Sequence, residues 1–162
     1  MNNTLSSKIL NWILIFGIIL TFLALIGTPL VTTAFLKSAF SILNQTLVFK
    51  ISACIYVCSI PYIISLFKIK KLCGLVVKNR PFSIESVTAL KTIAICAFVE
   101  ILLVGSTFLY LKRSTEFFMG FPMGIPLIPT LIICIPVGLL CLVFSGLFHN
   151  AMEIKEENDQ TI

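Results

Sequence analysis

The sequence predicts an all-α integral membrane protein, a four-helix bundle formed by a single domain (residues 1–162) with both termini in the cytoplasm. Hydrophobic residues make up 58% of the chain and charged residues only 12%, and the mean hydropathy is +1.07. Soluble domains carry charge on about a quarter of their residues. The apolar residues gather in four runs, each long enough to cross a bilayer at about 1.5 Å per helical residue.

The first span is expected at residues 9–31, an uncharged run dense in Ile, Leu and Phe. A cleaved signal peptide is the competing interpretation, with Lys8 as its basic flank and residues 32–34 as a weak cleavage site. The apolar run exceeds the roughly 7–15 residues typical of a signal peptide, and three more runs follow, so we expect a retained span. The first connection then covers residues 32–45.

The second span is expected at residues 47–67. Lys50 lies near its outer boundary, where the aliphatic stem of the side chain can remain in the apolar layer while the ammonium group reaches water. Pro61 lies inside the span and should kink the helix, because proline removes one backbone hydrogen bond.

A basic cytoplasmic loop is expected at residues 68–86, with an amphipathic helix lying along the membrane surface over its first part. With both termini inside, eight of the twelve cations lie on the cytoplasmic side and four on the other, which agrees with the positive-inside rule. The cations that flank apolar runs set topology and contact lipid headgroups, so we expect no direct nucleic-acid binding. Five loop cations fall within thirteen residues: Lys68, Lys70, Lys71, Lys78 and Arg80.

A helix start follows this loop. Pro81 disfavours helical geometry in the residue before it, and Ser83 is a good N-cap. Glu85 falls in the first turn, where the helix dipole favours an anion. Phe82 and Val87 have the spacing of a hydrophobic staple. These residues predict a helix that begins next to Ser83.

The third span is expected at residues 87–111 and the fourth at residues 123–148, joined by a short outer connection at 114–122. Pro136 is expected to kink the fourth span. An acidic cytoplasmic tail, residues 149–162, completes the chain.

Glu100 is the one acidic residue inside a span, nine residues after Lys91 and about 13 Å into the apolar layer. An ionisable group at this depth is a functional candidate by default. No span carries a basic residue at mid-membrane depth to pair with it, so we expect a protonated, hydrogen-bonded carboxyl group. Its role is either structural hydrogen bonding or a site for a proton, an ion or a ligand.

The six cysteines contain no CxxC pair and imply no disulfide framework. Small residues at 4-3-4 spacing form one stripe in the second span and one in the fourth, a pattern that lets membrane helices approach closely within one chain or between chains. We therefore expect packing rather than metal or redox chemistry, no cofactor and no catalytic residue. The stripes are Cys54, Cys58, Pro61 and Ser65, and Cys134, Gly138, Cys141 and Ser145.

Acidic residues in the tail outnumber its single cation, Lys155. If the fourth helix continues into the tail, they lie at a C-terminal end where the helix dipole disfavours them, so helix stability does not explain them. The tail either keeps the terminus solvated, docks on the basic loop or captures a soluble partner. The acidic residues are Glu153, Glu156, Glu157 and Asp159.

Two stretches, residues 78–82 with the helix start that follows and the tail 151–162, resemble the bacterial four-span membrane-protein family of unknown function 2975. Gln160 stands where that family usually has leucine. The resemblance implies a bacterial inner-membrane protein encoded next to a very small helix-turn-helix regulator. That family has no assigned activity, so no catalytic residue can be carried over.

The leading hypothesis is a non-enzymatic protein whose basic loop and acidic tail bind a small helix-turn-helix DNA-binding regulator at the bilayer. The alternative is a small transporter, or an immunity factor against membrane-active peptides, that uses Glu100. An intramembrane enzyme is disfavoured, because the chain lacks HExxH, GxSxG and paired intramembrane aspartates. The ligand, the oligomeric state and the sign of any regulation stay open.

Overall fold

The computed structural model describes residues 3–40, 44–77 and 82–160, with side chains for all of these except residues 3–11, 39, 156 and 158–160. Nearly all of the described chain is helical: α1 (Asn3–Phe40), α2 (Gln45–Val77), α3 (Ile84–Ser114) and α4 (Gly124–Gln160), with a short 3-10 helix, η1 (Glu116–Phe118), before α4. Each of the four long helices includes a segment long and apolar enough to cross a membrane: Trp12–Ser38, Gln45–Val77, Ile84–Ser114 and Gly124–Lys155. The predicted all-α membrane fold is confirmed.

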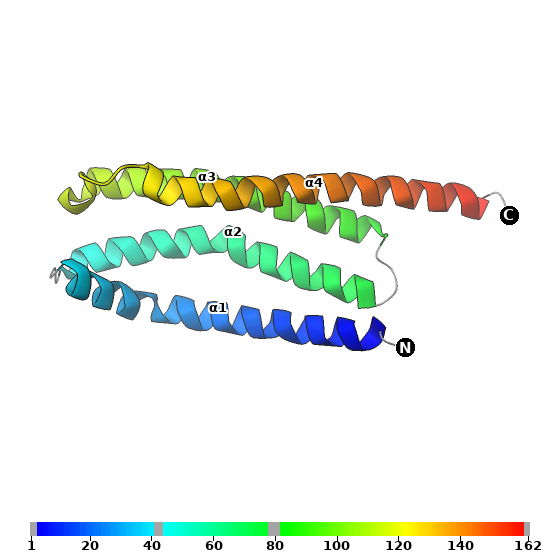
Figure 1. Ribbon diagram of the computed structural model, residues 1–162, viewed down its shortest axis with the longest axis horizontal. Coiled ribbons are helices and arrows are strands. Elements are labelled where there is room, and N and C mark those ends of the chain that lie inside the picture. Colours follow the sequence, from blue (N-terminus) through cyan, green and yellow to red (C-terminus); the bar gives the residue numbers. More distant parts are fainter. Residues whose placement is uncertain (1–2, 41–43, 78–81, 161–162) are drawn as a thin grey trace.

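Consecutive helices run antiparallel, so α1 begins and α4 ends at the same end of the molecule (Figure 1). We call this end, which also holds the end of α2 and the start of α3, the terminal end. The opposite end holds the end of α1, the start of α2 and η1, and we call it the aromatic end.

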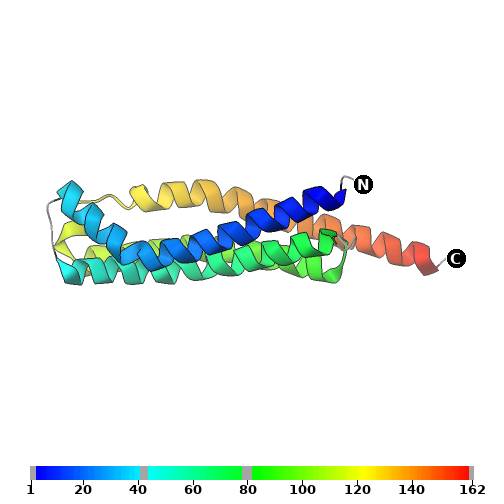
Figure 2. The same cartoon turned by 90° about the horizontal axis from the view of Figure 1, so that it is seen from below.

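The helices pack in the order of the chain. α1 packs on α2, α2 on α3 and α3 on α4, and within the described residues no other pair of these four helices is in contact. The α3–α4 interface is the largest, and Figure 2 shows α4 extending beyond the other helices at the terminal end. α1 and α4 are therefore edge helices, and lipid would surround their exposed apolar side chains in a bilayer.

The densest packing lies between α3 and α4. Val87 and Ala94 of α3 are 2% and 0% exposed. A Cβ atom built on Gly138 of α4 would lie 3.0 Å from the ring of Phe98, so the absence of a side chain lets the two helices approach closely. Ser145 of α4, 1% exposed, donates a hydrogen bond of 3.3 Å to the carbonyl oxygen of Val87. The predicted packing role of the small-residue stripe on α4 is confirmed at these two positions.

α1 is longer than its predicted span, and the connection predicted at residues 32–45 is correspondingly shorter, because α1 continues to Phe40. The hydroxyls of Thr32 and Thr33 donate to the carbonyl oxygens of Thr28 and Pro29 at 2.8 and 2.7 Å, an arrangement that helices accommodate. No glycine or proline occurs between residues 32 and 40 to end the helix.

α2 and α4 also extend past their predicted spans. The helix predicted to lie separately along the membrane surface after residue 68 is instead the last part of α2, which is continuous to Val77. The tail predicted at 149–162 is helical to Gln160. Lys and Leu in the first stretch, and Ala, Met, Glu and Lys in the second, favour helix, and neither stretch contains proline, so no proline stops either helix where the charged residues begin.

Candidate functional site

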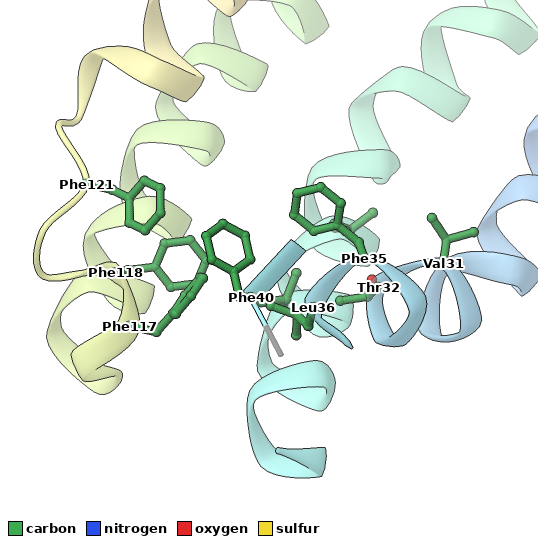
Figure 3. A pocket seen from close by; sticks show the side chains of 10 residues that line it. Val31, Thr32, Phe35, Leu36, Phe40, Phe117, Phe118 and Phe121 are labelled. Carbon is green, nitrogen blue, oxygen red and sulfur yellow. The ribbon is translucent and has the colours of Figure 1, made fainter. Parts of the chain in front are cut away.

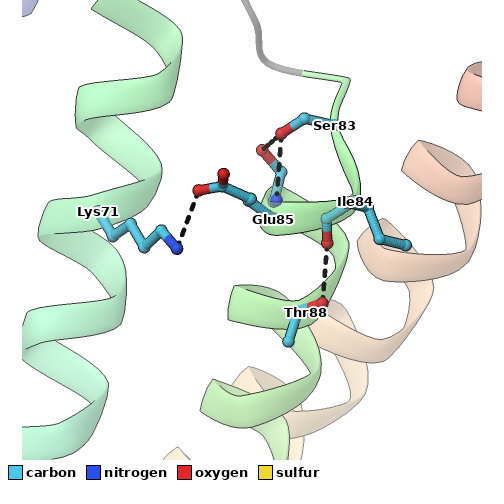
Figure 4. A network of polar contacts seen from close by, with 6 residues as sticks. Lys71, Ser83, Ile84, Glu85 and Thr88 are labelled. Carbon is cyan, nitrogen blue, oxygen red and sulfur yellow. Dashed lines mark hydrogen bonds and ion pairs between the residues drawn. The ribbon is translucent and has the colours of Figure 1, made fainter.

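The start of α3 at the terminal end has the predicted capping geometry. Ser83 has extended backbone angles (φ −141°, ψ 154°), and its hydroxyl accepts a hydrogen bond of 3.3 Å from the amide of Ser86 (Figure 4). Glu85 lies in the first turn, as predicted. Phe82 packs edge-to-face against Phe148 of α4, with centroids 5.1 Å apart. Pro81 lies outside the described residues.

An ion pair joins the last part of α2 to the first turn of α3. Lys71 Nζ lies 2.9 Å from Glu85 Oε2, and the two side chains are 51% and 54% exposed (Figure 4). Such an exposed pair stabilises by about 1 kcal/mol at most. Sequence reasoning assigned Lys71 to partner binding and missed this contact.

The structure describes only two of the other four predicted loop cations. Lys68 and Lys70 are half-buried on α2. Lys78 and Arg80 lie outside the described residues. Within the part of this basic stretch that the structure describes, Lys71 pairs with Glu85, and a joint role for the five cations stays a prediction.

The acidic tail is the C-terminal part of α4, which extends past the ends of α2 and α3 (Figures 1 and 2). His149 Nε2 lies 3.3 Å from Glu153 Oε1, one turn further along, with side chains 49% and 59% exposed. Glu157 is also exposed. The side chains of Glu156 and Asp159 lie outside the described set. The tail therefore presents carboxylates on a preformed helix.

Glu100 lies in the middle of α3 and is half-buried. It lies on α3, the helix that packs against both α2 and α4. Glu100 Oε2 is buried and has no hydrogen-bond partner within the described residues. The Cys58 thiol itself lies 3.5 Å from the hydroxyl of Thr107. Glu100 is therefore a polar group in the protein interior with unused hydrogen-bonding capacity.

An apolar cavity of about 350 Å³ lies at the aromatic end, between the end of α1, α2 and the η1 segment (Figure 3). Phe40 lies against Phe117 and Phe121, with centroids 4.9 and 6.4 Å apart. The hydroxyl of Thr32, which also lines the cavity, is already bonded to a backbone carbonyl. The cavity therefore offers apolar surface for packing and few groups that could form hydrogen bonds.

A second cavity, of about 520 Å³, lies between α1 and the first half of α2. It is lined by Ser52, which is 5% exposed and whose hydroxyl has no partner within the described residues. Sequence reasoning missed this site. The signal that could have found it is polar Gln45, Ser52 and Tyr56 recurring near the helical period on one face of α2.

Comparison with known proteins decides the family. The model of a family described as "Protein of unknown function (DUF2975)" matches residues 36–162. The chain belongs to the DUF2975 family. The DUF2975 match takes in the end of α1 and all of α2, α3, η1 and α4, and it leaves most of α1 outside. No curated protein and no solved structure matches this chain.

Proposed function

We propose that this DUF2975 protein is a non-enzymatic protein of the bacterial inner membrane that binds a small helix-turn-helix DNA-binding regulator at its cytoplasmic face and holds it at the membrane. The observation that carries the proposal is the tail, in which α4 continues as one helix beyond its neighbours with Glu153 and Glu157 exposed. Acidic residues at this end oppose the helix dipole, so the dipole does not account for them.

Electrostatics supports a basic partner. DNA-binding proteins concentrate Lys and Arg on the surface that contacts phosphates. A carboxylate-bearing helix is complementary to such a surface and would steer its association. Because the tail is already helical, less ordering entropy is lost on binding. A regulator held through its basic surface would be kept from DNA while bound, and this protein itself would not contact nucleic acid.

The test is affinity capture from mild detergent with the tagged full-length chain, with bound proteins identified by mass spectrometry. We expect the full chain to recover a small helix-turn-helix protein, and a chain ending at Met152 to lose it. A full-length variant with Glu153→Gln and Glu157→Gln should recover at least tenfold less. Lys112→Gln and Arg113→Gln, at the aromatic end, form the matched control and should leave recovery unchanged. Equal recovery by the truncated chain would show that the tail is not needed to bind the regulator.

A second candidate function is a small transporter or an immunity factor against membrane-active peptides that uses Glu100. It is favoured by Oε2 of Glu100, which is buried on the helix that packs against both α2 and α4 and has no hydrogen-bond partner within the described residues. Glu100→Gln keeps the shape and hydrogen bonding of the side chain and removes its ionisation. Transport or peptide protection should fall at least tenfold in this variant, while Glu116→Gln at the aromatic end should have no effect. Regulator capture should survive Glu100→Gln, so the two functions are separable.

A further inference from the structure

A polar pocket of about 420 Å³ opens at the aromatic end, next to the apolar cavity of Figure 3. The start of α2 lines one side of this polar pocket, and the end of α3 with η1 lines the other. Phe117 lines both the polar pocket and the apolar cavity. On α2, Lys50 of the polar pocket is followed directly by Ile51 of the apolar cavity. The two spaces therefore adjoin.

The two spaces follow each other along the helices in the order of a phospholipid's parts. Asn44 lines the polar pocket where α2 begins, whereas Ile55, which lines the apolar cavity, lies five residues beyond Lys50, about 7.5 Å deeper. From α1, the apolar cavity is lined from Phe40 at the end of the helix back to Val31. An acyl chain in the apolar cavity would run along the helices, with its head group at their ends.

The polar pocket is lined by one side chain of each charge. Lys50 on α2 and Glu116 on η1 both line it, and neither forms an ion pair with a residue that the structure describes. Lys50 Nζ donates one hydrogen bond of 2.9 Å to the carbonyl oxygen of Ser114, and an ammonium group has three protons to donate. Lys50, which is half-buried, and the exposed Glu116 therefore keep hydrogen-bonding capacity for a ligand.

The other polar side chains of the pocket carry no charge. Asn44 Oδ1 accepts two backbone amides at the start of α2, and the Thr115 hydroxyl donates to a backbone carbonyl oxygen at 2.6 Å. The side-chain oxygen of Ser114 is buried and out of a ligand's reach. The exposed Thr46 can add a hydrogen bond. Water can solvate both charges in an empty pocket, so a ligand gains affinity by neutralising them together and by burying apolar surface.

These two charges limit the head group that fits. A purely anionic head group would meet the carboxylate of Glu116, and a purely cationic one would meet the ammonium group of Lys50, and both juxtapositions are unfavourable. A head group with one phosphate and one ammonium group is complementary to both side chains. A primary ammonium group can also donate a charge-assisted hydrogen bond to the carboxylate, whereas a quaternary one has no proton to donate.

We propose that this site binds phosphatidylethanolamine from the membrane, with the phosphate on Lys50, the primary ammonium group on Glu116 and one acyl chain in the apolar cavity. A free zwitterion such as an amino acid would match the charges but leave the apolar cavity empty. The site uses neither the tail nor Glu100, so it stands or falls separately from both functions proposed above.

The test measures ligand-dependent stability of the full chain in mild detergent. The probes are dioctanoylphosphatidylethanolamine, the corresponding phosphatidylglycerol and phosphatidylcholine, and phosphoethanolamine, which has the head group without the chains. We expect a saturable rise in the unfolding temperature with the phosphatidylethanolamine. Its apparent Kd should be at least fivefold lower than that of either other lipid and at least tenfold lower than that of phosphoethanolamine.

Three variants separate the site from general effects on folding. Glu116→Lys should reverse the preference between phosphatidylethanolamine and phosphatidylglycerol, a result that partial unfolding cannot produce. Lys50→Gln keeps a donor for the carbonyl oxygen of Ser114 and should raise the apparent Kd for phosphatidylethanolamine at least tenfold. Arg113→Gln is the matched control, since Arg113 is exposed at the same end and lines neither space, and it should leave the Kd unchanged.

The proposal is overturned if phosphatidylethanolamine gives no saturable shift, or if phosphatidylglycerol or phosphatidylcholine binds the parent chain as tightly. Unchanged lipid preference in Glu116→Lys, or an unchanged Kd in Lys50→Gln, would also contradict it. Equally tight binding of phosphoethanolamine would overturn the lipid assignment and point to a soluble zwitterion as the ligand.

Discussion

The phenolic hydroxyl of Tyr56 on α2 donates a hydrogen bond of 3.1 Å to the backbone carbonyl oxygen of Leu25 on α1. Leu25 lies four residues before Pro29, and proline has no amide hydrogen with which to close that helical bond. Tyr56 thus supplies the donor that Pro29 lacks. This contact satisfies the carbonyl oxygen that Pro29 leaves open and joins α1 to the helix on which it packs.

Tyr56→Phe is therefore expected to lower the free energy of unfolding by about 1 kcal/mol, within the range found for hydrogen bonds between membrane helices. In a Pro29→Ala background the new backbone amide at this position can donate to the carbonyl oxygen of Leu25, so the same Tyr56→Phe change should cost less. The measurement is a double-mutant cycle of unfolding free energies in detergent. Tyr62→Phe, exposed on the same helix, is the control. An equal cost of Tyr56→Phe in both backgrounds would contradict this account.

Gly138→Leu should weaken the α3–α4 interface. A Cβ atom at this position already approaches the ring of Phe98 to 3.0 Å, and a longer side chain forces the ring or the helix to move. We expect a loss of about 1–3 kcal/mol in unfolding free energy, typical of overpacking. Gly146→Leu lies on the same helix with nothing within 4 Å of its added Cβ atom, so its cost should be small. Similar costs at the two positions would count against a tight contact at Gly138.

Ser83→Ala should cost about 1 kcal/mol, because it removes the side-chain acceptor for the amide of Ser86 at the start of α3. Lys71→Gln, which breaks the exposed ion pair with Glu85, should cost less and lose its effect in high salt. Chemical unfolding at low and high salt measures both. A cost for Lys71→Gln larger than that for Ser83→Ala would show that the ion pair, not the cap, holds this end of α3.

The terminal end should face the cytoplasm, because the cation-rich segments lie there. In a background with the six native cysteines replaced, a membrane-impermeant maleimide should label Arg113→Cys in intact cells. Glu153→Cys should be labelled only after the membrane is permeabilised. Both positions are exposed in the structure, so accessibility within the protein does not limit labelling. The opposite labelling pattern would show that the terminal end, and with it the tail, faces away from the cytoplasm.

Much of the fold was accessible from the sequence because its signals are local. Four long apolar runs identify four helices, and Ser83 with Glu85 identifies the start of α3, since a cap involves only residues within one turn. Where the helices end was less accessible, because the spans were predicted from apolar runs alone. Phe40, Val77 and Gln160 end their helices well after the apolar runs stop, because a change from apolar to charged residues does not by itself interrupt a backbone helix.

By itself, the sequence determined that this chain is an all-α membrane protein with four long apolar helices and an acidic end. The tertiary structure decided that the helices pack in sequence with α1 and α4 at the edges, that Tyr56 meets Leu25, and that Ser52 lines a cavity without a hydrogen-bond partner among the described residues. The physical reason is that each apolar helix presents hydrophobic residues on all sides. Hydrophobic periodicity therefore cannot mark the face that packs, although the spacing of small residues marked it on α4, and only the spatial arrangement shows which polar groups are satisfied.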